Sequence, residues 1–280
     1  MNAHKITITE QEFDRFCLFL EQACGILLAK HKQYLVESRL SKILIDGQYG
    51  SLGRLVDSLS LPGKSHLKEQ VINAMTTNET LWFRDIHPYE ILKGKLLPEL
   101  ASSLSGQRLK IWSAACSTGQ EPYSISMILD EFKSENPGVF SYGEEVVATD
   151  ICTRVLEQAR QAEYEMLALG RGLSQDRLKT FFEPGKSEAW SLKPQIKNRV
   201  RFRELNLLGS YVGIGSCDIV FCRNVLIYFS TERKREILQK IHKTLKPGGY
   251  LLLGASESVA ELNDLFEMVH CRPGIIYKAK

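Results

Sequence analysis

Four short stretches of the sequence place polar side chains where a ligand could bind. The first is WSAACSTGQEPYS (112–124), which follows an apolar run and precedes a helical pattern. A loop between a parallel strand and the next helix lies at the edge where open α/β sheets bind ligands, with free backbone N–H groups. Small residues at Ala114, Ala115, Ser117 and Gly119 would let a ligand approach the backbone. The alternative is a purely structural turn.

Asp150 is the second polar group that the pattern places at this edge. It ends the next predicted strand, where nucleotide-binding α/β domains often keep an acid that accepts hydrogen bonds from ribose hydroxyls. Alone it could be a helix N-cap, but beside the loop of residues 112–124 a ligand role is favoured. It lies further beyond Gly119 than the roughly 20 residues of the dinucleotide fingerprint, which excludes an ordinary dehydrogenase site.

Two more stretches carry arginines beside aromatic residues. The segment CDIVFCRNVLIYF (217–229) runs a buried strand into Arg223 and Asn224 at the same edge, followed by Tyr228, which could instead be a core aromatic with its hydroxyl at the surface. The segment TTNETLWFRD (76–85) bridges two predicted domains and ends near Arg84. An arginine there could clamp a carboxylate, or it could join the domains.

The elements around these stretches fall into two regions. From Thr9 to about Ala74 the pattern is helical, beginning with a capping box formed by Thr9 and Glu12. The next predicted helix, 30–45, directs three leucines inward, namely Leu35, Leu40 and Leu44. Shorter helices are predicted at 51–60 and 65–75, on either side of the break at Pro62 and Gly63.

The rest of the chain alternates strands and helices. The predicted strands are 109–113, 145–149, 200–204, 217–222, 249–254, 268–272 and 275–279. The predicted helices are 121–135, 152–162, 231–245 and 257–265. This alternation predicts a doubly wound, mainly parallel sheet. Since only Pro273 and Gly274 separate the last two strands, they should form an antiparallel edge hairpin, a topology associated with methyltransferases rather than with nicotinamide dehydrogenases.

Composition and charge exclude several classes of protein. The chain of 280 residues is 44% hydrophobic with no transmembrane-length apolar run and no signal peptide, so we expect a cytoplasmic protein and a monomer. The seven cysteines and six histidines are scattered without metal-ligand spacing, so no metal site is expected. Residues 170–203 hold nine basic and three acidic side chains, a net +6, although the whole chain carries only +3.

Five linked motifs resemble the signatures of the CheR family, the chemotaxis receptor methyltransferases that use S-adenosylmethionine. They are TNETLWFRD, CSTGQEPYS, ATDI, LNLL and FCRNVLIYF, and the resemblance runs over essentially the whole chain. It implies a helical receptor-recognition domain (1–75) and a linker that contributes to the cofactor site (76–88). It also implies a Rossmann-like methyltransferase domain (89–280) with a seven-stranded sheet and a small antiparallel insertion at about 165–203.

The resemblance also implies residue roles. The cofactor contacts would be Asn78, Thr80, Arg84, Glu121, Asp150, Asn206, Leu207, Arg223 and Asn224. Tyr228 would lie beside the transferred methyl group, and Arg84 suits the methionine carboxylate. The substrate would be a glutamate side chain on the cytoplasmic helical bundle of a methyl-accepting chemotaxis receptor. The products would be a glutamate methyl ester and S-adenosylhomocysteine. Because such a glutamate, with a pKa near 4.3, is already anionic, the reaction needs alignment and a dry site rather than a general base.

Lys32, Arg39 and Lys42 on the second helix suit the acidic surface around methylated glutamates. They could also be an ordinary solvated face. The sequence departs from the family pattern at Cys152, where many members have a second aspartate. It also departs at residues 183–202, which are shorter and poorer in glycine than in members that bind a receptor C-terminal pentapeptide. We therefore expect no dependence on such a tether.

Two other classes of function are open at this stage. An amine or nucleic-acid methyltransferase would use the same cofactor, and the basic insertion favours it. The stretch RNVLIYF, however, lacks the two prolines of the Asn-Pro-Pro-Tyr loop of amino-group methyltransferases. The aromatic residues of the insertion are also needed for its own core. A non-catalytic cofactor-binding adaptor is disfavoured because every motif residue is retained.

Overall fold

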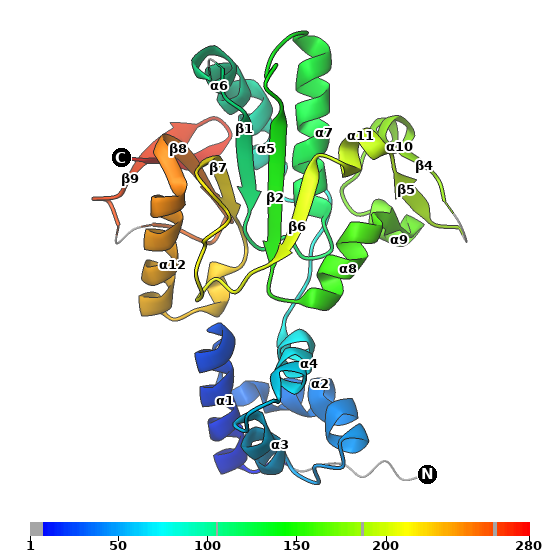
Figure 1. The fold of residues 1–280 in the computed structure, drawn as a ribbon, viewed down its shortest axis with the longest axis vertical. Coiled ribbons are helices and arrows are strands. Elements are labelled where there is room, and N and C mark those ends of the chain that lie inside the picture. The colour runs from blue at the N-terminus through cyan, green and yellow to red at the C-terminus, as the bar shows by residue number, and fades with distance from the viewer. Residues whose placement is uncertain (1–7, 105, 186–187, 260–261) are drawn as a thin grey trace.

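The computed structural model describes residues 8–104, 106–185, 188–259 and 262–280, which form a small helical bundle joined to a larger α/β domain (Figure 1). The bundle consists of α1 (Glu10–Cys24), a 3₁₀ turn η1 (Lys30–Lys32), α2 (Gln33–Asp46), α3 (Leu52–Leu59) and α4 (Ser65–Met75). The predicted capping box is confirmed: the Thr9 hydroxyl accepts from the Glu12 N–H, and the Glu12 carboxylate accepts from the Thr9 N–H.

The bundle has its own apolar core, to which α1 contributes Phe13, Phe16 and Leu20. The prediction that Leu35 points into this core is wrong. Val36 takes the buried position because it shares one face of α2 with Leu40 and Leu44, at four-residue spacing. The half-buried Leu35 faces the cavity described below.

The larger domain is built on a seven-stranded sheet. Its spatial order is β6 (Val200–Glu204), β2 (Glu144–Asp150), β1 (Leu109–Ser113), β7 (Cys217–Cys222), β8 (Leu245–Leu253), β10 (Gly274–Ala279) and β9 (Phe266–Cys271). The pairings from β6 to β8 are parallel, and β10 is antiparallel to both of its neighbours. The predicted parallel sheet with a terminal hairpin is therefore confirmed.

Apolar cores cover both faces of the sheet, as the alternation along each strand requires. Ile111 belongs to one buried cluster and Trp112 to the other. The first cluster includes side chains from α5 (His87–Ile91), the π-helical turn η2 (Leu92–Leu96), α6 (Leu97–Ser103), α7 (Gln120–Glu135) and α8 (Thr153–Gln161). The second is covered by α12 (Thr231–Thr244). None of the helices in the described ranges combines the length and apolar character needed to cross a bilayer.

The insertion forms a second, three-stranded antiparallel sheet beside α7 and α8 (Figure 1). Its strands are β3 (Glu163–Tyr164), β4 (Phe182–Pro184) and β5 (Trp190–Leu192), and its helices are α9 (Met166–Leu169), α10 (Gln175–Phe181) and α11 (Pro194–Lys197). Trp82 of the linker packs edge-on against Tyr164 and Phe182, with ring centroids 4.9 and 5.5 Å away. The linker and the insertion therefore share a core.

Several basic residues of the 170–203 segment are paired within the protein. Arg177 lies 3.8 Å over the Phe83 ring and binds both oxygens of Glu131. Arg201 binds Glu145 at 3.0 Å. This use of the charge in folding weakens the argument for a nucleic-acid surface.

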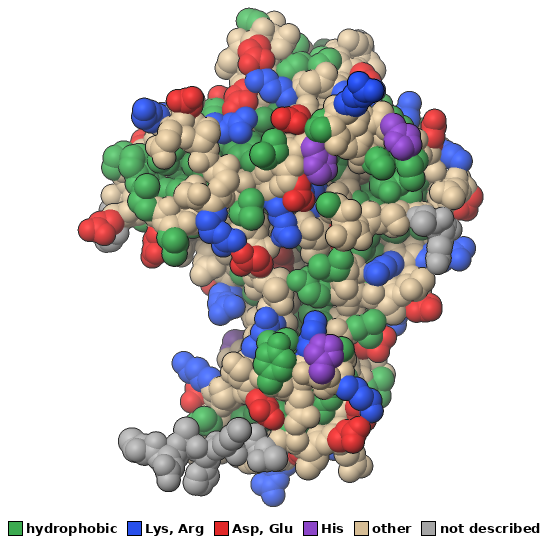
Figure 2. Space-filling view, turned by 180° about the vertical axis from the view of Figure 1, so that it is seen from behind, with side chains coloured by type: hydrophobic (Ala, Val, Ile, Leu, Met, Phe, Trp, Pro, Cys, Tyr) green, Lys and Arg blue, Asp and Glu red, His purple; other side chains and the backbone are tan. Residues whose placement is uncertain are grey.

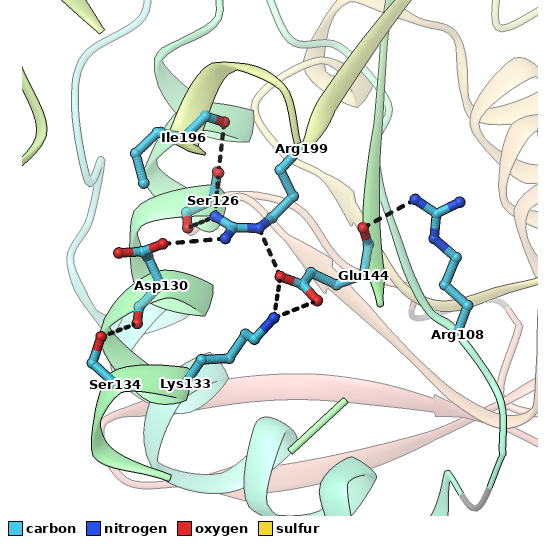
Figure 3. Close-up of polar contacts among 8 residues, drawn as sticks. All are labelled: Arg108, Ser126, Asp130, Lys133, Ser134, Glu144, Ile196 and Arg199. Carbon is cyan, nitrogen blue, oxygen red and sulfur yellow. Dashed lines mark hydrogen bonds and ion pairs between the residues drawn. The ribbon is translucent and has the colours of Figure 1, made fainter. Parts of the chain in front are cut away.

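A polar network fixes the amino-terminal ends of the parallel strands (Figure 3). The buried Glu144 carboxylate, at the start of β2, accepts hydrogen bonds from Lys133 Nζ at 3.0 Å and from Arg199 Nε at 2.9 Å. Arg199 also donates to the Ser126 carbonyl and to Asp130. These charges lie at the end of the sheet opposite to the carboxyl ends of β1, β2 and β7, so they stabilise the scaffold rather than line the candidate site.

The prediction of a helix at 257–265 is wrong. Within the described part of that segment the chain turns without forming a helix, and residues 260–261 lie outside the description. The apolar spacing there resembles a helical pattern, but the Glu257 carboxylate bonds to backbone N–H groups of other segments, which favours a turn. In addition, β8 begins at Leu245, earlier than the predicted 249.

Candidate cofactor site

A cavity lies between the helical bundle and the carboxyl ends of the parallel strands. Its lining includes the α1–α2 connection, α2, the linker, the loop after β1, Asp150, and the segments after β6 and β7. The predicted cofactor residues all border it, namely Asn78, Thr80, Arg84, Glu121, Asp150, Asn206, Leu207, Arg223 and Asn224. Tyr228, Lys32 and Arg39 border it too, whereas Lys42 does not line it. Segments distant in sequence thus meet at one site.

The loop after β1 has a fixed shape. Its backbone enters the left-handed region at Ser117, with φ of 49°, and at Gly119, with φ of 96°. A Cβ at Gly119 would lie 3.0 Å from the Tyr164 hydroxyl and the Tyr123 ring, so this position requires glycine. The Ser117 hydroxyl donates to the Asn78 carbonyl at 2.7 Å, which ties the loop to the linker.

Asp150 organises the same loop. Its carboxylate accepts hydrogen bonds from the Ser117 N–H at 2.8 Å and from the Cys152 N–H at 2.9 Å. The N-cap residue of α8 is Cys152, so Asp150 is not the N-cap that the sequence allowed. Burial raises the pKa of Asp150, and its backbone hydrogen bonds oppose this shift. The carboxylate borders the cavity, where ligand hydroxyls can satisfy its remaining lone pairs.

Arg223 forms a buried ion pair at the floor of the cavity. Its guanidinium donates to Glu121 at 3.1 Å, to Asp85 at 2.6 Å and to the Arg84 carbonyl at 2.9 Å. Glu121 also accepts from the Ser113 hydroxyl at 2.8 Å. Burial raises the pKa of Glu121, whereas the Arg223 charge and the Ser113 hydrogen bond act in the opposite direction. Arg223 is thus already neutralised by two acids.

Arg84 differs from Arg223 because its charge is available. It is half-buried, and its Nη1 donates to the Glu79 carbonyl at 3.3 Å. Within the described residues Arg84 has no carboxylate partner. A planar guanidinium that faces a cavity in this state can bind a ligand carboxylate with two parallel hydrogen bonds.

The comparisons with known proteins agree with this geometry. Residues 11–76 match the model of the CheR methyltransferase all-alpha domain, and residues 78–275 match that of the CheR methyltransferase SAM binding domain. The chain belongs to the CheR methyltransferase family. It is 55% identical over 269 residues to chemotaxis protein methyltransferase Cher2 of Pseudomonas putida, and equally so to chemotaxis protein methyltransferase 1 of Pseudomonas aeruginosa. Each alignment covers 96% of this chain and 98% of the relative.

It is also 36% identical to the chemotaxis protein methyltransferase of Salmonella typhimurium, over 92% of this chain and 87% of the relative. The protein is therefore a chemotaxis methyltransferase that depends on S-adenosylmethionine. The cavity of this CheR family member fits that cofactor. Asp150 suits hydroxyl groups, Arg84 suits a carboxylate, and Ala114 and Ala115 leave room for a bulky apolar body. Glu121 and Asp150 together disfavour a phosphate.

The helical bundle of this CheR protein closes one side of the cavity. Asn206 donates from its amide to the Ala23 carbonyl at 2.8 Å, and the Leu27 N–H donates to the Tyr228 carbonyl at 2.9 Å. Tyr228 is half-buried and faces the cavity, and its hydroxyl has no hydrogen-bond partner among the residues that the structure describes. That hydroxyl is free to bind a substrate.

The three basic residues predicted on the second helix have different surroundings. Arg39 donates to the Met75 carbonyl at 2.7 Å and to the Thr77 hydroxyl at 3.1 Å, so its charge holds the linker. Lys32 is half-buried at the cavity, and Lys42 is exposed. In the space-filling view, Lys and Arg side chains gather around the waist between the bundle and the larger domain (Figure 2).

Sequence reasoning missed several residues of the site. Asp85 and Glu257 were not singled out, although each binds a residue of the 223–228 segment. The apolar wall formed by Ile26, Leu27 and Leu28 was also missed, because an ordinary apolar run in a helical region carries no signal of a ligand. For Asp85, the acid beside Arg84 in the linker motif was an available clue.

Proposed function

We propose that this CheR-family enzyme transfers the methyl group of S-adenosylmethionine to side-chain carboxylates of specific glutamates on methyl-accepting chemotaxis receptors. The products would be glutamate methyl esters and S-adenosylhomocysteine. The observation that carries this proposal is the protonation chemistry of the cavity. Among its described lining residues there is no histidine, and each lining carboxylate already accepts a hydrogen bond, namely Glu79, Glu121 and Asp150.

A cavity whose described lining has no histidine, and whose carboxylates are all held in hydrogen bonds, suits a nucleophile that is anionic before it binds. A glutamate side chain with a pKa near 4.3 meets this condition at neutral pH, whereas an ammonium substrate would first have to lose a proton. The cations that border the cavity, Lys32, Arg39 and Arg84, would also attract a carboxylate. These features support an acidic substrate over an amine or a nucleic acid.

In this proposal Asp150 binds the ribose hydroxyls, and Arg84 binds the methionine carboxylate. When bound, S-adenosylmethionine supplies an electrophilic methyl group on a positively charged sulfur. Tyr228 donates a hydrogen bond that orients the substrate carboxylate, or presents its ring to the sulfonium. The remaining predicted contacts enclose the cofactor and exclude water, namely Asn78, Thr80, Glu121, Asn206, Leu207, Arg223 and Asn224. The chain's contribution to rate is alignment in a dry site.

We further propose that residues 1–75 recognise the receptor, that residues 76–88 contribute to the cofactor site, and that residues 89–280 carry the transferase with its insertion. Lys32, Arg39 and Lys42 would bias the bundle toward the acidic cytoplasmic helical bundle of the receptor, which places the enzyme in the cytoplasm. Lys42, exposed and without a partner among the described residues, is the best placed to reach a receptor.

The insertion supports a proposal about receptor docking. Its strands β4 and β5 are only three residues each, and Gly185 is the single glycine of segment 183–202. We propose that the enzyme needs no C-terminal receptor tether. Calorimetric titration with a receptor C-terminal pentapeptide should give no heat, and binding in the micromolar range would contradict this proposal.

One experiment tests the substrate class. The enzyme is incubated with methyl-labelled cofactor and receptor-containing membranes, and the products are then treated with mild base. Volatile labelled methanol identifies a carboxyl ester and supports the proposal. A base-stable label would identify an amine or nucleobase product, and the absence of label would favour a non-catalytic adaptor. Either of these two results would refute the proposed reaction.

A further inference from the structure

Glu257 binds three backbone N–H groups beside the cofactor cavity. Its Oε2 accepts from the Asn224 N–H and the Gly254 N–H, each at 2.7 Å, and its Oε1 accepts from the Leu226 N–H at 2.7 Å. Charge-assisted hydrogen bonds of this length are among the strong ones in proteins. One carboxylate therefore joins the end of β8 to the turn that follows β7.

The turn that Glu257 holds has an unusual backbone. Asn224 lies in the left-handed region with φ of 58°, and the chain then enters the 3₁₀ turn η3 (Leu226–Tyr228). A Cβ on Gly254 would lie 2.8 Å from the backbone nitrogen of Asn224 and 2.7 Å from Asn224 Nδ2 and from Glu257 Oε2, so the two segments approach as closely as a glycine allows. Such a conformation persists only when its surroundings fix it.

This turn lies between two side chains that border the cofactor cavity, Arg223 and Tyr228. Arg223 precedes Asn224 and lies at the cavity floor, and Tyr228 follows at the cavity wall. Glu257 itself lines a different cavity, on the side of η3 that faces α12, and it is not part of the cofactor cavity lining. Glu257 therefore does not border the cavity, and it can act on the site in two ways: through the backbone that it holds, and through its charge, which contributes to the raised pKa of Glu121.

We propose that Glu257 is a positioning residue for methyl transfer, which presets the turn of residues 224–228 so that the Tyr228 side chain meets the substrate in the correct place. This inference rests on the proposed function of Tyr228. Without the carboxylate, three N–H groups lose their acceptor and the turn relaxes. A displacement of about 1 Å at a reacting group can cost about 100-fold in rate.

The test compares Glu257→Ala and Glu257→Gln in kcat, in the KM for cofactor, and in the melting temperature. Glu257→Ala should lower kcat at least about 10-fold. Glu257→Gln should have a smaller effect, about 3-fold, because one amide oxygen can still accept from two N–H groups while the NH₂ group opposes the Leu226 N–H. Glu144→Gln is the matched control, since it changes a buried carboxylate at the opposite end of the sheet. It should lower the melting temperature and leave kcat unchanged.

Coupling to Tyr228 distinguishes positioning from a general loss of structure. In a Tyr228→Phe background, Glu257→Gln should change kcat less than about 2-fold, since the hydroxyl whose position it sets for the substrate carboxylate is gone. The same fractional loss in both backgrounds would overturn the proposal, as would an unchanged kcat in folded Glu257→Ala and Glu257→Gln variants. If Tyr228→Phe alone left kcat unchanged, the role of Tyr228 would fail with it. The proposed substrate is tested separately by methanol release from wild-type reactions.

Discussion

Replacement of Arg223 by methionine should destabilise the protein strongly. The Arg223 side chain is 1% exposed, and its guanidinium lies 3.1 Å from Glu121, whose side chain is 11% exposed, and 2.6 Å from Asp85. Removal of one partner from a buried ion pair costs about 3–5 kcal/mol, because the other charge stays buried without compensation. Here the charge left behind is mainly that of Glu121, since Asp85 is partly exposed and can be solvated.

The expected change can be measured as a melting temperature. In a chain of this size, 1 kcal/mol corresponds to about 2–4 °C, so a cost of about 3–5 kcal/mol should lower the melting temperature of Arg223→Met by about 6–20 °C. Glu121→Gln should cost less, about 1.5–3 kcal/mol, because Arg223 keeps its bond to Asp85. The Arg223→Met/Glu121→Gln variant should be more stable than Arg223→Met alone, since glutamine at position 121 leaves no unpaired buried charge.

The pH dependence of Arg223→Met follows from the pKa of Glu121. Burial already raises that pKa in the wild type, where Arg223 opposes the shift, and loss of Arg223 raises it further. A carboxyl with a folded-state pKa above its unfolded value stabilises the fold below the unfolded pKa and loses this contribution as the pH rises through the folded pKa. The difference in melting temperature between Arg223→Met and the wild type should therefore become smaller as the pH falls from 8 to 5.5. Two results together would refute this account. The first is a difference in melting temperature that stays constant with pH, and the second is a loss of stability in the Arg223→Met/Glu121→Gln variant equal to the sum of the losses in the two single variants.

Four further predictions concern individual side chains. Tyr228→Phe should keep affinity for S-adenosylhomocysteine, measured by calorimetry, but lower kcat; equal loss of both would show that the tyrosine is structural. Arg84→Met should lower the affinity for S-adenosylhomocysteine by about 10-fold or more, since a hydrogen bond to a charged group is worth about 1.5–3 kcal/mol. An unchanged affinity would exclude Arg84 as the carboxylate ligand. Lys42→Glu should raise the receptor KM without changing cofactor binding, and an unchanged receptor KM would indicate an ordinary solvated residue. Glu12→Gln should lower stability at neutral pH by no more than about 1 kcal/mol, because the side chain is only half-buried and water screens its charge. The Thr9 N–H lowers the Glu12 pKa to about 2, so this difference should shrink as the pH falls from 4.5 through 2, and a difference that grew with acid would contradict the assignment.

The sequence predicted the central strands of the sheet well because they are buried runs with clear ends. Leu109–Ser113 and Cys217–Cys222 were predicted with the observed limits, since small residues follow the first and Arg223 and Asn224 follow the second. The edge strand Val200–Glu204 was also predicted with the observed limits, although three of its five residues are exposed. The helix at 257–265 was wrongly predicted because its apolar spacing is local information, whereas the backbone bonds of Glu257 come from distant segments. Local periodicity does not report such tertiary contacts.

In the candidate site, too, the features set by local sequence could be predicted and those set by tertiary contacts could not. Asp150 and the 112–124 loop could be placed from sequence, since the carboxyl ends of neighbouring parallel strands share one edge. The different states of the two arginines could not be predicted. Arg223 is neutralised because α7 places Glu121, and the linker places Asp85, against the end of β7, and both are tertiary contacts. Arg84 is available because no carboxylate among the described residues lies against it. The cavity-facing position of Leu35 likewise depends on which face of α2 packs into the bundle core.

The single glycine of the loop after β1 explains how the separate parts of the chain act on one cofactor site. Gly119 is required because Tyr164 of the insertion and Tyr123 of α7 crowd the position where a Cβ would lie. Two residues earlier, Ser117 is fixed by Asp150 of β2 and by the Asn78 carbonyl of the linker. The loop therefore takes its shape from the sheet, the linker and the insertion rather than from its own flexibility. A glycine-rich loop would suit a phosphate that needs a bare backbone, whereas this rigid loop of small residues suits a cofactor without phosphates. A movement of the linker or the insertion would change the loop through these contacts, so we expect binding in this cavity to respond to segments far from it in sequence.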